Sequence, residues 1–282
     1  MTTAAGTIAP AALAAATPAM NIPTELEKFE SALFRSGRSR NTVVVYTRAI
    51  RRFLESGYSD PLDWLVADRL DGASAAKIRG NAAALKSWAK YRDDAAAIAA
   101  LSDYKLPTLG APTPHPVPGG VNIVRAVLMT VADPRARCLI ALGALAGLRV
   151  SESRSIDSRC WDLASNTLVV RGKGDKTRNI PVSEELFGIL TKNMPSDGSK
   201  FVPFGDKWAR VQITRAFDKL DVKHADGSSI SSHDLRATFA TEVYGKTKDI
   251  RLVQYYLGHS SVEQTQVYIK IADQSIRNGV NL

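Results

Sequence analysis

Five prolines crowd one short segment of this chain, at positions 107, 112, 114, 116 and 118. A proline ring clashes with the preceding helical turn and removes a hydrogen-bond donor, so proline at this density stops a helix and stiffens a linker. We therefore place a linker at residues 106–120, between a domain at residues 21–105 and a second domain at residues 121–282. Residues 1–20, rich in Ala and Thr, are predicted to form a flexible N-terminal extension.

The first domain carries apolar side chains at helical spacing. Apolar residues recur at steps of three and four in three segments, residues 23–34, 43–54 and 74–91. We predict a helix over each segment and hence a small helical bundle. Basic side chains occupy many of the remaining positions, among them Arg79 and Lys86, which are candidates for contact with DNA. An ordinary solvated surface explains these two residues equally well.

The second domain combines helical patterns with one predicted hairpin. Short runs rich in β-branched residues at 168–170 and 180–182 flank the turn-prone residues 172–175, a typical hairpin signal. Trp161 and Leu163 are assigned to a third strand, and helical patterns precede and follow these strands. The predicted fold class is therefore mainly α, with a helical domain followed by an α+β domain that contains a small antiparallel sheet.

Charge and cysteine content narrow the class of protein. The formal net charge is +9, and the two parts of the chain share it: 14 basic and 11 acidic residues up to Lys105, 23 and 17 beyond it. This balance favours a polyanionic partner such as nucleic acid. Cys138 and Cys160 form no CxxC pair and are interpreted as reduced thiols. No apolar run approaches the roughly 20 residues that span a bilayer, so we expect a cytoplasmic protein.

Five motifs follow one another along the second domain. They are residues 147–152 (GLRVSE), 172–178 (GKGDKTR), 233–236 (HDLR), 257–260 (LGHS) and Tyr268. In this order they resemble the first arginine motif, the lysine hairpin, the HxxR box, the LGH box and the nucleophilic tyrosine of the tyrosine recombinases, the family of phage integrases and Xer-type enzymes. Each motif alone is weakly specific, but the ordered set spans nearly the whole domain. The first domain also loosely resembles the core-binding domain of that family.

The resemblance implies a role for each basic residue of the motifs. Attack on a DNA phosphodiester builds negative charge on the phosphoryl oxygens, and fixed donors aimed at those oxygens stabilise the transition state. Arginine suits this task because its planar fork binds phosphate and stays charged. Arg149 and Arg236 are therefore expected to clamp the phosphate. A surface pair of Arg149 with Glu152 or Asp157 is the structural alternative.

Tyr268 is the expected nucleophile. A phenol has a pKa of ~10, so it needs positive charge or a base nearby. His233 is expected to assist proton movement, and His259 to donate a hydrogen bond to a phosphoryl oxygen, although a capping role for His259 is the plainer alternative. Tyr255 and Tyr256 are competing nucleophiles by sequence, but their helical apolar context favours packing.

The remaining motif residues are expected to support the reaction. The resemblance selects Lys173 as the general acid that protonates the leaving 5′-hydroxyl oxygen. Lys176 and Arg178 are expected to contact the DNA backbone instead. Glu152 is expected to orient part of the site, with an exposed helix carboxylate as the alternative. Helix positions at residues 207–215 are further candidates for reading bases.

The family resemblance further implies a 3′-phosphotyrosyl intermediate that conserves the phosphodiester energy, so no cofactor, metal or ATP is expected. It also implies a C-shaped clamp on duplex DNA at its attachment sites. We expect a monomer in solution and a homotetramer on synapsed DNA, with a possible accessory directionality factor. Only about 20 residues of low complexity precede the first domain, so we expect binding to core-type sites without an arm-binding domain.

Four biological interpretations share these residues. A phage or mobile-element integrase, located at the nucleoid of a bacterial host and serving viral genome integration, is the leading hypothesis. An Xer-type enzyme that resolves chromosome or plasmid dimers uses the same catalytic set and often works with a paralogue. A type IB topoisomerase shares the chemistry but relaxes supercoils without site preference. An inactive DNA-binding protein is disfavoured because every catalytic position is occupied.

Overall fold

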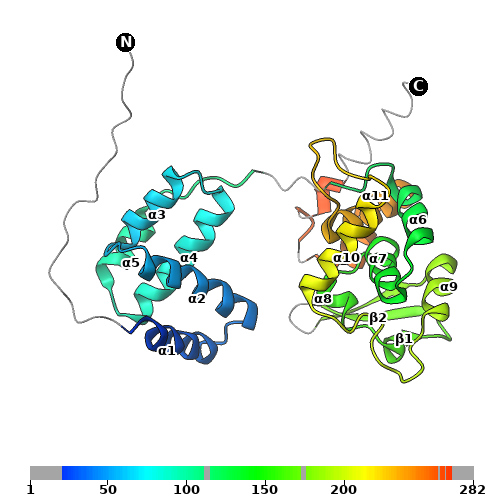
Figure 1. Cartoon of the computed structure of the whole chain (residues 1–282), viewed down its shortest axis with the longest axis horizontal. Coiled ribbons are helices and arrows are strands. Elements are labelled where there is room, and N and C mark those ends of the chain that lie inside the picture. The colour runs from blue at the N-terminus through cyan, green and yellow to red at the C-terminus, as the bar shows by residue number, and fades with distance from the viewer. Residues whose placement is uncertain (1–20, 111–114, 173–175, 260, 264, 269–282) are drawn as a thin grey trace, which may run out of the picture. The chain divides into compact units, whose positions relative to one another are not determined.

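The computed structural model describes residues 21–110, 115–172, 176–259, 261–263 and 265–268 of the chain. The chain separates into two compact units, Met1–Ala111 and Pro112–Leu282 (Figure 1). Each unit has a hydrophobic core of its own. Helices predominate in the described residues, and the strands form one small antiparallel sheet, which confirms the predicted fold class.

The first unit is a bundle of five helices within its described residues. Their bounds are α1 Ile22–Arg35, α2 Arg40–Glu55, α3 Pro61–Leu70, α4 Ala75–Tyr91 and α5 Ala95–Asp103. Ser39 begins α2 as an N-cap, because its side chain accepts a hydrogen bond from the backbone N–H of Thr42 at 3.2 Å. The three helices expected from periodicity are α1, α2 and α4, and all three are confirmed.

Periodicity missed α3 and α5, and each helix has a local reason. In α3 the apolar stripe is short, but Asp60 caps two backbone N–H groups and Pro61 occupies the first helical position. In α5 most residues are alanines, and only Ala97 and Leu101 are buried. A run of alanine gives little contrast between faces, so no periodic signal stands out although the helix propensity is high.

The second unit is built around one buried helix. Its elements are α6 Gly120–Thr130, α7 Pro134–Ala146, α8 Val150–Ser153, the 3-10 turn η1 Ser158–Cys160, β1 Trp161–Asp162, β2 Thr167–Arg171, β3 Thr177–Pro181, α9 Glu184–Lys192, α10 Asp206–Asp218, α11 Ser232–Thr247 and α12 Ile250–Leu257. Helix α7 is apolar on nearly all sides and packs against α6, α8, α9, α10 and α11 (Figure 1). It therefore joins two of the elements that carry motif residues, α8 and α11, to the rest of the core.

The sheet has the strand order β1-β2-β3, and both pairings are antiparallel. Leu168 pairs with Ile180, and Val170 pairs with Arg178. All four of these residues are buried while their neighbours on β2 and β3 are exposed or half-buried. The period of two along β3 therefore places a guanidinium on the same face as the core residue Ile180. This inward arginine becomes part of the site.

Among the described helices, none combines the length and the apolar character needed to cross a lipid bilayer.

Truncating the centre of α7 should destabilise the second unit strongly. Ile140 is fully buried there, and replacing a buried isoleucine by alanine costs about 2–5 kcal/mol through lost burial and a residual cavity. We expect Ile140→Ala to lower the free energy of unfolding of this unit by that amount in urea titrations followed by circular dichroism. Leu163→Ala, at an exposed position, is the control and should change stability by less than about 0.5 kcal/mol. Equal losses in both variants would contradict the central role of α7.

Candidate active site

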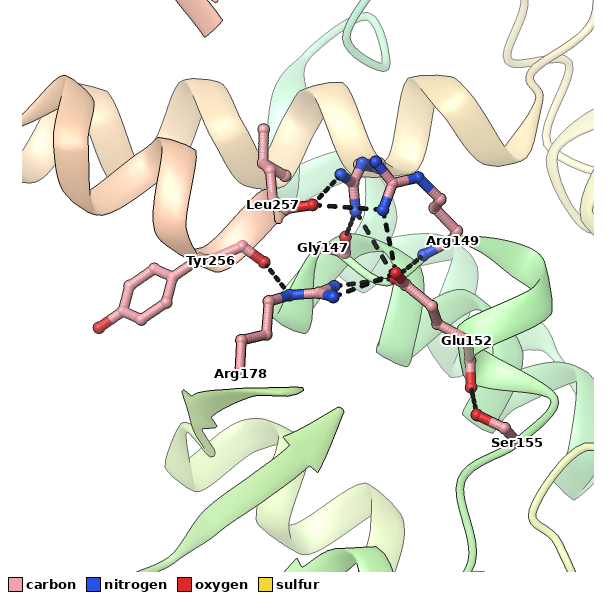
Figure 2. Close-up of polar contacts among 8 residues, drawn as sticks. Gly147, Arg149, Glu152, Ser155, Arg178, Tyr256 and Leu257 are labelled. Carbon is pink, nitrogen blue, oxygen red and sulfur yellow. Dashed lines mark hydrogen bonds and ion pairs between the residues drawn. The ribbon is translucent and has the colours of Figure 1, made fainter. Parts of the chain in front are cut away.

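Glu152 lies at the centre of the site, buried to 5 % exposure. It sits in the first turn of α8, where Oε2 accepts the backbone N–H of Arg149 at 2.9 Å. Oε1 accepts the Arg149 guanidinium at 2.9 Å (Figure 2). Burial would raise the pKa of Glu152, but hydrogen bonds from Arg178 and from the Arg149 backbone hold it below its ordinary value. The carboxylate is therefore ionised at neutral pH.

Arg178 reaches the same carboxylate from β3. Its Nη1 lies 3.1 Å from Oε1 of Glu152 and its Nη2 lies 2.8 Å from Oε2, the two-pronged geometry that arginine forms with carboxylates (Figure 2). Its Nε donates to the backbone carbonyl of Tyr256 at 2.7 Å. Arg178 is only 6 % exposed, so the expected contact with the DNA backbone is wrong. The inward face of β3, shared with Ile180, accounts for the difference.

Arg236 is the third arginine of this group. It lies on α11, is buried, and donates to the backbone carbonyls of Gly147 and Leu257. Its Nη1 lies 3.8 Å from Oε2 of Glu152. Burial lowers the pKa of Arg236 to about 9, and the positive charge of Arg149 acts in the same direction. Arg236 therefore keeps its charge at pH 7.

The three guanidiniums around one carboxylate leave an excess of two positive charges in a partly desolvated place. Arg149 is the most accessible of the three, with 41 % of its side chain exposed. Its Nη1 also approaches the carbonyl of Leu257 at 3.4 Å, so Arg149 and Arg236 converge on one oxygen atom. That atom is a neutral carbonyl oxygen, so it leaves the excess positive charge uncompensated, and such an excess is suited to an anionic ligand.

Arg149 and Arg236 line a pocket of about 620 Å³ beside this cluster. Most residues that line the pocket have polar or charged side chains; besides the two arginines, the lining residues are Val150, Ser151, Asp206, Arg210, Thr214, Ser229, Ile230, Ser231, Ser232 and His233. His233 is exposed at the start of α11, where its backbone N–H donates to the Ser231 side chain. The structure thus brings together the first arginine motif and the HxxR box, which lie more than 80 positions apart in the sequence.

His259 contacts Tyr268 and lies within electrostatic reach of the arginines. Its Nδ1 is 3.0 Å from the Thr265 hydroxyl, and its ring stacks on that of Tyr268 with centroids 6.4 Å apart. Burial lowers the pKa of His259 to about 4, and Arg236 and Arg149 act in the same direction. The imidazole is therefore neutral at pH 7 and can donate one hydrogen bond only.

Tyr268 is 8 % exposed and packs in a small apolar cluster with residues of α11 and α12, including Phe239 and Leu257. Burial raises the pKa of its hydroxyl, and the charges of Arg236 and Arg149 oppose this rise. Both arginines are thus close enough to stabilise a phenolate.

The two competing tyrosines have other contacts. The Tyr255 hydroxyl accepts the backbone N–H of Asn179 on β3 at 3.1 Å. Tyr256 is half-buried, and burial raises its pKa. The packing roles that their helical context favoured agree with these contacts.

Several expected site residues lie elsewhere. Lys173 falls outside the described residues, and Lys176 is exposed at the end of its loop. Arg79 and Lys86 belong to the first unit, where Arg79 is exposed and donates to the carbonyl of Pro107 at 3.4 Å, while Lys86 is half-buried.

The comparisons with known proteins agree with this geometry. The phage integrase family model matches residues 122–275. This chain belongs to the phage integrase family. It is a tyrosine recombinase, an enzyme that breaks and rejoins DNA strands.

Named relatives extend over most of the recombinase chain. The tyrosine recombinase XerA of Pyrococcus horikoshii is 29 % identical over 270 residues, covering 90 % of this chain and 92 % of the relative. The tyrosine recombinase XerC of Methylobacterium nodulans is 30 % identical, with 83 % of each chain covered.

Solved structures share the fold of the recombinase. XerH bound to palindromic difH substrate, in a post-cleavage complex, has a TM-score of 0.66 at 18 % identity and covers 92 % of this chain and 84 % of its own. The Tn1549 transposon integrase in complex with transposon right end DNA has a TM-score of 0.62 at 14 % identity, with 91 % and 99 % covered.

Two features of the recombinase site were missed by sequence reasoning. Arg210 and Thr214 on α10 line the pocket. Residues 207–215 were candidates for contacting DNA bases, and nothing in the sequence distinguishes the positions that face the pocket from those that face outward. The start of α11 is fixed by a capping box, in which Asp234 accepts the backbone N–H of Ser231 at 2.6 Å. The spacing of Ser231 and Asp234 is the signal that predicts such a box.

The depressed pKa of His259 leads to a test by titration. We expect its ring to titrate near pH 4 in the folded protein, followed by NMR, because burial and the arginines oppose its charging. Its ordinary pKa is about 6.5, so the unfolded chain binds this proton first and stability should fall as pH drops from about 6.5 toward 4. His259→Gln should lack this part of the pH dependence. A ring that titrates near 6.5 would contradict the arrangement.

Proposed function

We propose that this recombinase is site-specific and cleaves duplex DNA through a 3′-phosphotyrosyl bond to Tyr268. The Tyr268 oxygen attacks the scissile phosphorus, the bond to the 5′ oxygen breaks, and that oxygen takes a proton to leave as a hydroxyl. The 5′-hydroxyl of a partner strand then reverses these steps. The observation that carries the proposal is that Arg149 and Arg236 line one pocket and that the positive charges of both act on the Tyr268 hydroxyl.

Arg149 and Arg236 are proposed to bind the phosphoryl oxygens of the scissile phosphate. Their excess charge over Glu152 supports this role, since the charge that develops in the transition state is negative and the donors are already in place. Glu152 is proposed to fix the orientation of both guanidiniums. Its buried carboxylate contacts each of them within 3.8 Å.

The other motif residues complete the proposed site. His259, which is neutral at pH 7, is proposed to donate one hydrogen bond to a phosphoryl oxygen, and His233 to assist proton movement at the exposed edge of the pocket. Lys173 is proposed as the general acid on the strength of the motif that contains it. Lys176 is proposed to meet the DNA backbone.

For the biological role we propose a phage or mobile-element integrase that acts in the cytoplasm of a bacterial host. Two domains, residues 21–105 and 121–282, would clamp core-type attachment sites, with Arg79 and Lys86 contacting DNA. Four copies would assemble on the synapsed DNA, with an accessory factor setting direction. The net charge of +9 and the transposon right end DNA bound by the related Tn1549 integrase support a DNA partner.

An Xer-type role in dimer resolution is the second candidate. The observation that favours it is the sequence similarity of this chain to the tyrosine recombinases XerA, XerC and XerD of archaea and bacteria.

Covalent trapping tests the proposed chemistry directly. We would incubate the protein with nicked duplexes drawn from DNA that flanks its gene, without metal or ATP, and separate the products on denaturing gels. Wild type should give a slowly migrating adduct joined at the 3′ side of the break. Tyr268→Phe should give none, because the attacking oxygen is gone.

Tyr255→Phe is the matched control for this assay, since Tyr255 lies on α12 with its hydroxyl on the β3 backbone. It should form adduct within about twofold of wild type, a change of less than ~0.5 kcal/mol. An adduct that persists in Tyr268→Phe and disappears in Tyr255→Phe would overturn the assignment of the nucleophile.

The two biological roles predict different requirements. An integrase should recombine a pair of attachment sites when it is the only recombinase present. An Xer-type enzyme should act at a chromosomal site and often needs a paralogue. Recombination of plasmids that carry the flanking sites, with the purified protein alone, supports the integrase role; recombination only at a chromosomal site or only with an added paralogue supports the Xer-type role.

A further inference from the structure

Arg178 has no role in the mechanism proposed above. Its side chain nevertheless contacts segments that carry residues of that mechanism. It lies on β3, two residues after Lys176. Two of its nitrogens hold Glu152 on α8, and the third holds the carbonyl of Tyr256 on α12 (Figure 2). One side chain therefore ties together three elements that are separate in the sequence.

One motif glycine, Gly258, allows this close approach, and a second, Gly172, lies at van der Waals distance from the same guanidinium. A Cβ atom at Gly258 would lie 3.1 Å from Nη1 and 3.3 Å from Cζ of Arg178, and the backbone there has φ +61°. A Cβ atom at Gly172 would lie 3.4 Å from the same Nη1 and 3.7 Å from Oε1 of Glu152. Gly172 directly precedes Lys173, and Gly258 directly precedes His259. The guanidinium thus lies close to the backbone at both Gly172 and Gly258.

Only an arginine can make all of these contacts at once. The three contacts use Nε, Nη1 and Nη2, which lie in one plane at fixed angles. A lysine would keep the positive charge beside Glu152, but its single nitrogen cannot span the two carboxylate oxygens and the Tyr256 carbonyl. The side chain is 6 % exposed, so solvent does not replace a lost contact easily.

We propose that Arg178 is a positioning residue for the strand-cleavage reaction, which holds the Glu152–Arg149 pair in register with the end of α12 that leads to His259 and Tyr268. It acts through these groups and touches no DNA. This inference rests on the roles proposed above for Arg149, His259 and Tyr268. It also gives the glycine of the LGH motif a reason that does not depend on DNA contact.

The test compares Arg178→Lys with wild type in three assays: the fraction folded, the affinity for a site-containing duplex, and the single-turnover rate of adduct formation. We expect a folded protein whose Kd stays within about threefold of wild type, because the side chain is buried away from DNA. The cleavage rate should fall by about 100-fold, the effect of displacing reacting groups by roughly 1 Å.

Arg125→Lys is the matched control. Arg125 on α6 also pairs with a glutamate on another element, Glu185 on α9, at 3.0 Å, but this pair is exposed and outside the pocket. It should leave both Kd and cleavage rate within about twofold of wild type. If Arg178→Lys cleaves as fast as wild type, only a positive charge is needed and the proposal is overturned. If its Kd rises in proportion to the loss of rate, Arg178 contacts DNA and the proposal is equally wrong.

A second pair of variants decides the matter if Arg178→Lys does not fold. Gly258→Ala adds a Cβ atom against the Arg178 guanidinium. Gly198→Ala imposes a similar backbone strain, at φ +70°, but there the added Cβ atom would meet only the Ser158 hydroxyl, at 4.0 Å. Gly258→Ala should lower the cleavage rate at least tenfold relative to Gly198→Ala, with equal DNA binding; equal rates would overturn the proposal.

These outcomes are separable from failure of the proposed function. If wild type itself forms no adduct at Tyr268, the proposed chemistry fails first and Arg178 has no reaction to position. If wild type forms the adduct and Arg178→Lys forms it equally fast, the chemistry stands and only the role of Arg178 is lost.

Discussion

The second unit of this recombinase depends on one buried carboxylate surrounded by three guanidiniums. Each arginine alone would be costly to desolvate, and together they would repel one another. Glu152 compensates this charge while leaving an excess for an anionic substrate. Removing one partner of such a buried group typically costs about 3–5 kcal/mol, because the remaining charges stay buried and uncompensated. The same carboxylate therefore supports both the fold and the proposed chemistry.

The groups of this cluster come from four different elements of secondary structure. Glu152 comes from the first turn of α8, Arg178 from the inward face of β3, and Arg236 from the first half of α11. The carboxyl end of α12 supplies backbone carbonyls, which carry the negative end of the helix dipole and suit guanidinium donors. Because α7 lies behind α8 and α11, the apolar core fixes the distances within the polar site.

Much of this arrangement could be predicted from the sequence, and the exceptions have physical causes. The helical and hairpin periodicities gave the fold class correctly, but the alanine-rich α5 has too little contrast between its faces to show a stripe. Motif order predicted that Arg149, Arg236 and Tyr268 belong together. It could not show that Arg178 points inward, because the residues around Arg178 are polar and the sequence pattern is also that of an exposed strand. The partner that explains its burial, Glu152, lies 26 positions away in the sequence, and only the tertiary structure brings the two together.

The burial of Tyr268 would have a consequence for the stability of the proposed covalent intermediate. A phosphotyrosyl ester is a reactive link, and an attack by bulk water would release the protein and leave a permanent break. At 8 % exposure, the Tyr268 side chain lies against the apolar side chains of α11 and α12, which would limit the approach of water to a phosphorus atom bound to its oxygen. An incoming deoxyribose hydroxyl would instead be delivered to that phosphorus by its base-paired strand. Screening of this kind would favour religation over hydrolysis and thereby protect the genome while its backbone is open.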